Sequence, residues 1–122
     1  MDWKFTGDQP VYQQIRTLIR GAVVTGELAP GQRIPSVREI AASAQVNPNT
    51  VQRALSELER DGLLISGGTS GRTVTQDEKV LEALREDTFK ELARACAEKF
   101  RVFGLSPRQA AQLLMELEEE EA

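Results

Sequence analysis

Apolar residues recur at helical spacing along most of this chain, and the pattern predicts a largely helical fold. The first such stretch lies between Pro10 and Gly26, with apolar positions at offsets of 0, 4, 7, 8, 11 and 12. Proline suits the first turn of a helix and glycine suits the residue just past its end, so we expect one helix here. Its apolar face consists of Val11, Ile15, Leu18, Ile19, Ala22 and Val23.

Two more helices, separated by a tight turn, are predicted next. Ser36-Val-Arg-Glu39 has the pattern of a capping box, in which each side chain accepts a hydrogen bond from the other residue's backbone amide. We expect this helix to end near Ala44. Asn47-Pro48 then supplies an N-cap and a proline at the first helical position, and Gly62 closes the helix. The apolar face of this helix consists of Val51, Ala54, Leu55 and Leu58.

A glycine-rich hairpin is expected after these helices. Residues 63–66 and 72–75 have the composition of two short strands, residues 67–71 form the loop between them, and Arg33-Ile34 could add a small strand. Three helices followed by such a hairpin are the layout of a winged helix-turn-helix, whose third helix enters the major groove of DNA and whose loop is the wing. We therefore expect a mostly α fold with a small β-hairpin.

The C-terminal third is predicted to contain two helices. Thr75-x-x-Glu78 has the pattern of another capping box, which would start a long helix that Gly104 ends. Ser106-Pro107-x-Gln109 caps a last helix, whose apolar positions follow at offsets of 0, 3, 4 and 7 from Ala110.

The two C-terminal helices are expected to pair with a second copy of the chain. We assign residues 1–76 to a winged helix-turn-helix domain that binds DNA and residues 77–122 to a helical dimerisation tail. A segment this small buries too little of its surface alone, so its apolar faces need a partner. Cys96 lies in the same apolar stripe, and we expect it to be buried and inert. The predicted dimer interface consists of Leu84, Leu92, Phe100, Phe103, Leu113 and Leu117.

The composition leaves little means of catalysis. The chain has no histidine and one cysteine, so neither a zinc site of the usual ligands nor a histidine general base can be built in the ordinary way. We expect no enzyme activity, no metal ion and no cofactor. The lone cysteine, the lack of an apolar run near the roughly 18 residues of a membrane span, and the lack of a secretory signal indicate a cytoplasmic protein with no membrane partner.

Charge is divided unevenly along the chain. Residues 1–76 hold eight Lys and Arg against seven Asp and Glu, a net charge of +1, and residues 77–122 hold seven against twelve, a net charge of −5. The Glu118–Glu121 run contributes much of this acidity and is interpreted as a solvated, fraying helix end. DNA affinity must therefore come from individual arginines and helix N-termini rather than from overall charge.

The candidate base-contacting residues lie at the start of the third helix, the part that reaches base edges in this kind of fold. Asparagine and glutamine can pair with adenine, arginine can pair with guanine, and threonine suits a phosphate or a thymine methyl group. Asn47 alone is better explained as a helix cap, but the group as a whole faces away from the apolar side. These residues are Asn47, Asn49, Thr50, Gln52 and Arg53.

Arg38 is the candidate contact of the preceding helix. It lies in the first turn, two residues after the Ser36 cap, where it can bind a phosphate or reach into the groove. The alternative is an exposed ion pair with Glu39 or Glu57, which would be worth only about 0–1 kcal/mol.

The glycine-rich loop is a weaker candidate. It lacks the GxxxxGK[ST] pattern of a phosphate-binding loop and precedes a strand rather than a helix, so a hairpin tip is the better interpretation. Its glycines, Gly71 among them, would let the backbone approach DNA closely, and Arg72 is its only cation. A plain turn without a ligand remains the alternative.

At these positions the chain resembles the GntR family of bacterial transcription regulators, and its short two-helix tail is similar to that of YtrA-type members. The resemblance is dense over about the first 75 residues. The matching segments are Pro10–Ile15, Gly26–Gly31, Ile34–Ala41, Val46–Ala54 and Leu58–Leu63.

The resemblance implies a homodimeric repressor that binds double-stranded DNA at a palindromic operator. In the family, the arginine after the Pro-Ser pair, the early positions of the recognition helix and the glycine-bearing wing tip typically contact DNA. Carried to this chain, together with the cap and the wing arginine, the candidate DNA-binding residues are Ser36, Arg38, Asn47, Asn49, Thr50, Gln52, Arg53, Gly71 and Arg72.

The wing departs from the family pattern. Many relatives have roughly Arg-Arg-Gly-x-Gly-Thr-Phe-Val over this interval, whereas this chain has Gly67-Gly-Thr-Ser-Gly-Arg-Thr-Val74. Each lost phosphate contact flattens the dependence of log K on log salt by about 0.9, so we expect weaker and more salt-tolerant DNA binding.

A small-molecule effector is a further expectation of the resemblance, but no residue cluster indicates its identity. The tail is too small to enclose a cavity of about 300–1,000 Å³ within one subunit, so we expect a site between subunits, or between the tail and the DNA-binding part. The main alternative function is a protein-interaction module that keeps the winged fold without binding DNA, which the acidic composition and the poor wing favour.

Overall fold

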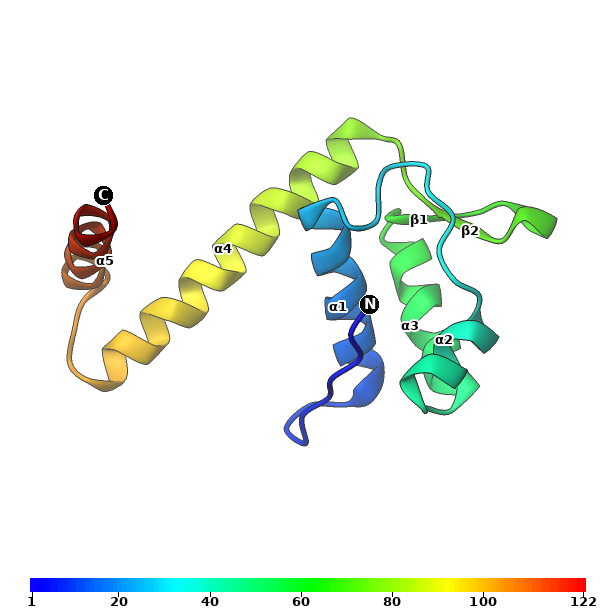
Figure 1. Ribbon diagram of the computed structural model, residues 1–122, viewed down its shortest axis with the longest axis horizontal. Coiled ribbons are helices and arrows are strands. Elements are labelled where there is room, and N and C mark those ends of the chain that lie inside the picture. Colours follow the sequence, from blue (N-terminus) through cyan, green and yellow to red (C-terminus); the bar gives the residue numbers. More distant parts are fainter. The chain divides into compact units, whose positions relative to one another are not determined.

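The computed structural model describes residues 1–122, apart from the side chain of Ser70. Along these residues three helices, an antiparallel hairpin and two further helices follow one another, which confirms a mostly α fold with a small β-hairpin (Figure 1). The elements are α1 (Val11–Thr25), α2 (Val37–Ala44), α3 (Pro48–Arg60), β1 (Leu64–Ser66), a short 3-10 turn (Gly68–Ser70), β2 (Arg72–Val74), α4 (Glu78–Val102) and α5 (Pro107–Glu121).

These elements form two compact units, unit 1 (Met1–Arg85) and unit 2 (Glu86–Ala122). The first turns of α4 belong to unit 1 because Leu81 is buried in its core and Leu84 packs against that core. The domain boundary expected between residues 76 and 77 stays a prediction.

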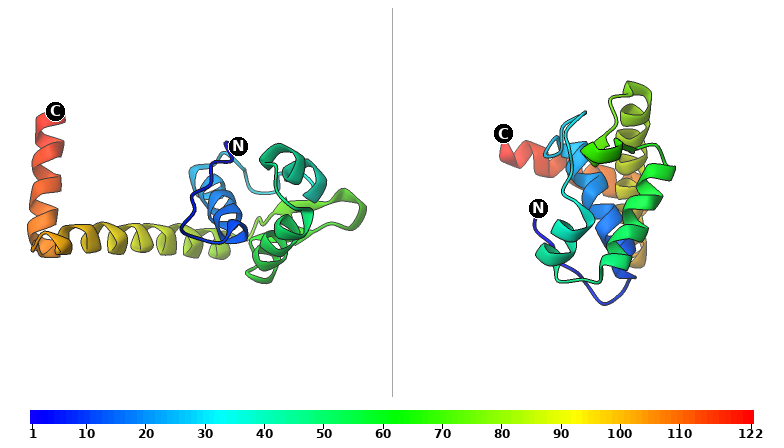
Figure 2. Two further views of the ribbon diagram at one scale, coloured as in Figure 1. Left: turned by 90° about the horizontal axis from the view of Figure 1, so that it is seen from below. Right: turned by 90° about the vertical axis from the view of Figure 1, so that its right-hand side faces the viewer.

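The core of unit 1 is built mainly between α1 and α3, which pack side by side, while α2 also packs on α3 (Figures 1 and 2). Ile15 and Ile19 of α1 meet Val51, Leu55 and Leu58 of α3 in this core, and each is at most 2% exposed. Burying one such side chain contributes about 1.5–3 kcal/mol. This packing determines which side of α3 faces outward.

Side-chain caps define the starts of α2 and α3. The Ser36 Oγ accepts from the Glu39 amide at 3.1 Å and the Ser36 amide donates to Glu39 Oε1 at 3.5 Å, so the predicted capping box is confirmed. Asn47 Oδ1 accepts from the Asn49 amide at 2.8 Å. Between the two helices Gln45 adopts a left-handed conformation, φ 57°, and this reverses the chain within a short turn.

The hairpin pairs β1 with β2, with Leu64 opposite Val74. The small strand expected at Arg33 is reduced to a single bridge between Arg33 and Thr73. Pro35 follows two residues later and has no amide hydrogen, so the ladder cannot continue.

The start of α4 differs from the prediction. A capping box between Thr75 and Glu78 is wrong, because α4 begins only at Glu78. Thr75 still belongs to the hairpin region, since its amide donates to the Leu63 carbonyl at 2.8 Å and its side chain is buried. Asp77 caps the helix instead, and its Oδ1 accepts from the Lys79 amide at 2.9 Å.

Unit 2 consists of the rest of α4 together with α5. Gly104, at φ 80°, follows the end of α4 as predicted, and Ser106 and Gln109 form the predicted capping box of α5. Ala110 is buried. Cys96 was predicted to be buried, but it is only half-buried.

Candidate nucleic-acid interface

Helix α3 has an apolar side and a polar side, as a helix that reads DNA requires. Val51, Ala54, Leu55 and Leu58 expose no surface at all. The predicted base-contacting residues remain outside this packing: Asn47, Asn49, Gln52 and Arg53 are exposed and Thr50 is half-buried. The structure therefore brings the predicted set together on the N-terminal half of one helix.

Two of these side chains make hydrogen bonds to residues of α3. Asn47 caps the helix by accepting a hydrogen bond from the backbone amide of Asn49, which is the role that its sequence position favoured. Gln52 Nε2 donates to the Ser56 Oγ at 3.0 Å. This bond uses one of the two hydrogens on Gln52 Nε2, so the other hydrogen and the amide oxygen remain for a base edge.

Arg53 is held by Tyr12 of α1. The guanidinium carbon of Arg53 lies 3.7 Å from the centroid of the Tyr12 ring, and its Nη2 donates to the Tyr12 hydroxyl at 3.0 Å. Its Nε also lies 3.8 Å from Glu57 Oε2. Stacking on an aromatic ring restricts an otherwise flexible side chain. The sequence did not indicate Tyr12 as a site residue, because this contact joins positions 41 residues apart.

The start of α2 carries the second part of the candidate interface. The Ser36 Oγ is engaged in the capping box, whereas Arg38 is exposed and makes no ion pair with any side chain that the structure describes. Among the described side chains, Arg38 forms neither of the ion pairs that the sequence offered as its alternative role. Glu39 caps α2, and Glu57 pairs with Arg53. Arg38 is thus available to a phosphate.

Arg72, expected to be the cation of the wing, turns back onto α3. Its Nε pairs with Glu59 Oε1, and its side chain is only 20% exposed. Glu59 lies about 15 Å along the helix axis from Asn49, given the rise of 1.5 Å per residue. The structure therefore does not bring Arg72 together with the predicted base-contacting residues.

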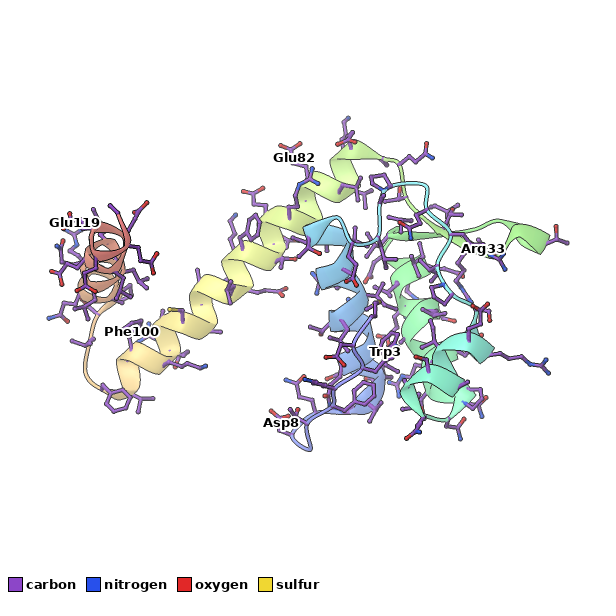
Figure 3. All side chains as sticks on the ribbon, viewed as in Figure 1. Trp3, Asp8, Arg33, Glu82, Phe100 and Glu119 are labelled. Atoms are coloured by element: carbon purple, nitrogen blue, oxygen red, sulfur yellow. The ribbon has the colours of Figure 1, made fainter. Side chains whose placement is uncertain are left out.

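Arg33 lies beside the wing instead. Gly71 has φ 77° and ψ −158°, a region that essentially only glycine occupies, and the Arg33 Nε is 3.3 Å from where a Cβ on Gly71 would stand. The bridge to Thr73 carries Arg33 to this place (Figure 3). Arg33 is exposed and has no ion pair within the described side chains. The sequence did not indicate it, because only the long-range bridge places it there.

The predicted dimer residues lie mostly uncovered. Leu92 is 68% exposed and Phe103 is 83% exposed, Leu113 and Leu117 are also exposed, and Phe100 is half-buried. Leu84 is the exception, because it packs against the core of unit 1. Further exposed apolar side chains of the same two helices are Phe89, Val102, Leu114 and Met115.

Among the described residues, no helix combines the length and the apolar character needed to cross a bilayer.

The sequence of this chain is similar to those of known bacterial regulators. The family described as "Bacterial regulatory proteins, gntR family" matches residues 11–74, more than half of the chain. The chain is 33% identical to the uncharacterised HTH-type transcriptional regulator YhcF of Bacillus subtilis, over 89% of this chain and 90% of that protein. It is 37% identical to the HTH-type transcriptional repressor YtrA of Bacillus subtilis, over 57% of this chain but only 54% of that repressor.

Solved structures share the fold. A GntR family transcriptional regulator from Listeria monocytogenes matches with a TM-score of 0.83 and 30% identity, over 92% of this chain and 98% of that chain. AraR(DBD), solved in complex with operator ORX1, matches with a TM-score of 0.57 and 28% identity, over 62% of this chain and 96% of that chain.

Proposed function

This chain belongs to the GntR family of bacterial regulatory proteins, and on that basis we propose that it represses transcription as a homodimer bound to a palindromic operator. Membership of the family makes it a transcription regulator with a DNA-binding helix-turn-helix rather than an enzyme. The observation that carries the finer proposal is α3, whose apolar side is fully buried while its amide and guanidinium side chains are exposed at one end.

In the proposed complex α3 lies in the major groove. Asn49 and Gln52 offer amide groups of the kind that pair with adenine, and Arg53 offers the two parallel donors that guanine accepts at O6 and N7. Thr50 and Arg38 are assigned to phosphates. Phosphate contacts set the position of the protein on the duplex, and base contacts set the sequence that it prefers.

For the wing we assign the phosphate contact to Arg33 rather than Arg72. The Arg72 guanidinium is already paired with Glu59, and releasing it would leave a half-buried carboxylate without its partner. Arg33 lies against Gly71 and is exposed. The absence of a Cβ at Gly71 is what allows this close approach.

A dimer supplies the two winged units that a two-half-site operator needs. One winged unit reads one half-site, and two half-sites separated by about 34–36 Å need two copies held together. The exposed apolar side chains of α4 and α5 support a pairing of tails, with Leu92, Phe103, Leu113 and Leu117 as its centre. Leu84 is left out of this interface because unit 1 already covers it.

The repressor assignment draws on the relatives. YtrA of Bacillus subtilis is a transcriptional repressor, and the AraR DNA-binding domain was solved on its operator. Outside α4 and α5, no described part of this chain offers a large exposed apolar surface with which to recruit RNA polymerase. Occupying the operator is the simplest way for such a chain to control transcription.

The proposal is tested by mixing the purified protein with fragmented genomic DNA from its source at physiological salt and sequencing what it retains. We expect an enriched palindrome whose half-sites lie about 10–10.5 base pairs apart, or a multiple of this spacing. Retention without sequence preference, or no retention at all, would contradict the proposal, and the second result would favour the protein-interaction module.

The phosphate contacts predict how affinity depends on salt. Replacing Arg38 or Arg33 by alanine should each flatten the slope of log K against log salt by about 0.9 per half-site, because one phosphate contact is lost. Arg72→Ala should leave that slope unchanged. Arg60→Ala is the matched control, since this exposed arginine lies at the other end of α3.

The slope is measured by fluorescence anisotropy with a labelled operator over a salt series. A wild-type slope for Arg33→Ala together with a flattened slope for Arg72→Ala would reverse the assignment of the wing contact.

The stacked pair of Tyr12 and Arg53 predicts a loss of base preference. Arg53→Ala should abolish discrimination at one base pair of each half-site, at a cost of about 1–3 kcal/mol. Tyr12→Leu should broaden the preference at the same base pair, because it removes both the ring and the hydroxyl that hold Arg53. Tyr12→Phe keeps the ring and should have the smaller effect.

These variants are compared on a set of operators that differ at single positions. If Tyr12→Leu lowers affinity evenly across the whole set, Tyr12 is only part of the framework and does not position Arg53.

A further inference from the structure

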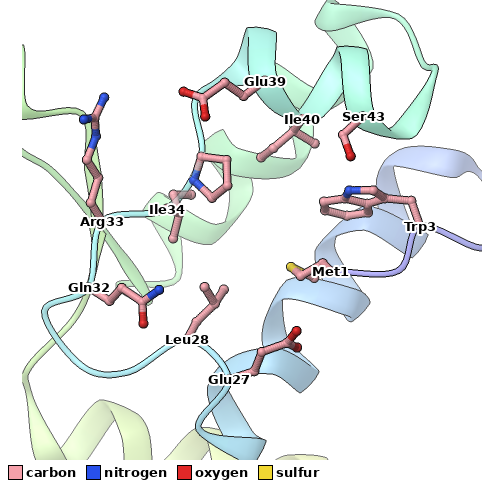
Figure 4. A pocket seen from close by; sticks show the side chains of 11 residues that line it. Met1, Trp3, Glu27, Leu28, Gln32, Arg33, Ile34, Glu39, Ile40 and Ser43 are labelled. Carbon is pink, nitrogen blue, oxygen red and sulfur yellow. The ribbon is translucent and has the colours of Figure 1, made fainter.

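A cavity of about 600 Å³ lies within unit 1, and none of its described lining residues belongs to α3 (Figure 4). Three segments surround it: the N-terminal residues Met1 and Trp3, the chain from Glu27 to Pro35 between α1 and α2, and the residues of α2 from Glu39 to Ser43. Its volume falls in the range of about 300–1,000 Å³ that small-molecule sites occupy. The cavity is inside the winged unit, whereas the sequence suggested an effector site between subunits, or between the tail and the DNA-binding part.

The walls of this cavity combine apolar and polar side chains, and one side of it is aliphatic. Leu28, Ile34 and Ile40 are buried, and each also belongs to the core of unit 1, so this wall is rigid. Trp3 faces them from the N-terminal segment, half-buried and packed against the same core. An aromatic wall opposite a firm aliphatic one suits a ligand with an apolar or aromatic body.

The lining residues carry two carboxylates, and Met1 adds its α-amino group. Glu27 and Glu39 lie towards opposite ends of the cavity, and both are exposed. Arg33 is the one cationic side chain among the described lining residues, but it extends away from the cavity and its guanidinium lies against Gly71. The lining therefore combines an indole ring with two carboxylates, and both groups attract organic cations.

We propose that this cavity binds aromatic organic cations and that their binding weakens the hold of the protein on DNA. The second half of the proposal rests on the proposed function. Its physical basis is Glu39, whose Oε1 accepts from the Ser36 amide at 3.5 Å and so completes the cap of α2. A cation that draws the Glu39 carboxylate into the cavity loosens the first turn of α2, which carries Arg38. By linkage, DNA then lowers the affinity for the cation by the same factor.

Trp3 gives a direct readout, because it is the only tryptophan of the chain. The probe is tetraphenylphosphonium, and its matched control is tetraphenylborate, which has the same shape and the opposite charge. We expect a saturable change of Trp3 fluorescence with the phosphonium, confirmed by calorimetry on the full chain without DNA, and binding of the borate that is weaker by at least about tenfold.

Variants test the two carboxylates. Glu27→Gln and Glu39→Gln should each weaken phosphonium binding by about threefold to tenfold, because each removes one attracting charge. Glutamine can still complete a capping box, so Glu39→Gln keeps the fold of α2. Glu82→Gln makes the same change of net charge on α4, outside the lining, and should leave binding unchanged.

Three results would overturn the site. The first is equal binding of phosphonium and borate, and the second is no saturable change of Trp3 fluorescence up to about 1 mM phosphonium. The third is an equal effect of Glu39→Gln and Glu82→Gln on phosphonium binding. The regulatory half is tested separately, by titrating the phosphonium into the complex of the protein with its selected operator. Release of the operator supports it, and an unchanged operator affinity at saturating phosphonium overturns that half alone. Failure of the protein to bind DNA at all, with Trp3 still responding to the phosphonium, would overturn the proposed function and leave the site standing.

Discussion

Placing charge on the apolar side of α5, with Leu113→Glu and Leu117→Glu together, should convert the proposed dimer into a monomer and weaken operator binding by about 100-fold or more. Both side chains are exposed within one chain, so the substitutions disturb no core that the isolated copy possesses. In a tail-to-tail dimer the same positions are covered, and two buried carboxylates per copy would oppose association strongly. Linking two half-site contacts through one interface is what gives the dimer its higher affinity.

Sedimentation at micromolar concentration and anisotropy on the selected operator measure the two effects. Gln112→Glu is the matched control, because it adds a negative charge to the same helix at an exposed polar position. Trp3 fluorescence reports whether unit 1 remains folded in each variant. A double variant that stays dimeric would refute the assigned interface, and a monomer with wild-type operator affinity would refute the need for a dimer.

The second large effect concerns stability rather than recognition. Leu55→Ala should lower the free energy of unfolding of unit 1 by about 2–5 kcal/mol, because it removes a completely buried side chain of α3 and leaves a cavity between α3 and its neighbours. Since Leu55 is on the side of α3 opposite the polar residues, the folded fraction should keep the base preference of the wild type.

Denaturant unfolding followed by Trp3 fluorescence measures this loss, because Trp3 packs against the same core. Ile65→Ala is the matched control in the same unit, since Ile65 is 48% exposed on β1 and its truncation should change stability by less than about 1 kcal/mol. Equal losses for the two variants would show that Leu55 does not anchor the core as its burial implies. A changed base preference for Leu55→Ala would show that the two sides of α3 are not independent.

Helix limits in this chain could be predicted because they depend on neighbouring residues. Ser36 caps α2, Asn47 caps α3 and Ser106 caps α5, and Gly104 follows the end of α4, all as their local patterns indicated. Each of these devices joins groups two or three residues apart, so the sequence contains the whole interaction. Thr75 marks the limit of such reasoning. Its pattern matched a capping box, but its backbone amide was already engaged by Leu63 across the hairpin.

The candidate interface was only partly predictable for the same reason. The polar side of α3 followed from the spacing of its apolar residues, and the exposed position of Arg38 followed from its place in the first turn of α2. The partners of the arginines could not be predicted from local spacing. Arg72 pairs with Glu59, Arg53 stacks on Tyr12, and the pattern of either residue alone favoured an outward side chain.

By itself, the sequence determined the family, the order of helices and hairpin, and the side of α3 that faces outward, because helical periodicity and end caps act over a few residues. The tertiary structure alone decided that the guanidinium of Arg33 lies against Gly71 while that of Arg72 pairs with Glu59, that Tyr12 holds Arg53, and that Trp3 lines a cavity beside α2. These arrangements join residues far apart in the chain. Contacts of that kind are set by how the helices pack, and no local pattern records them.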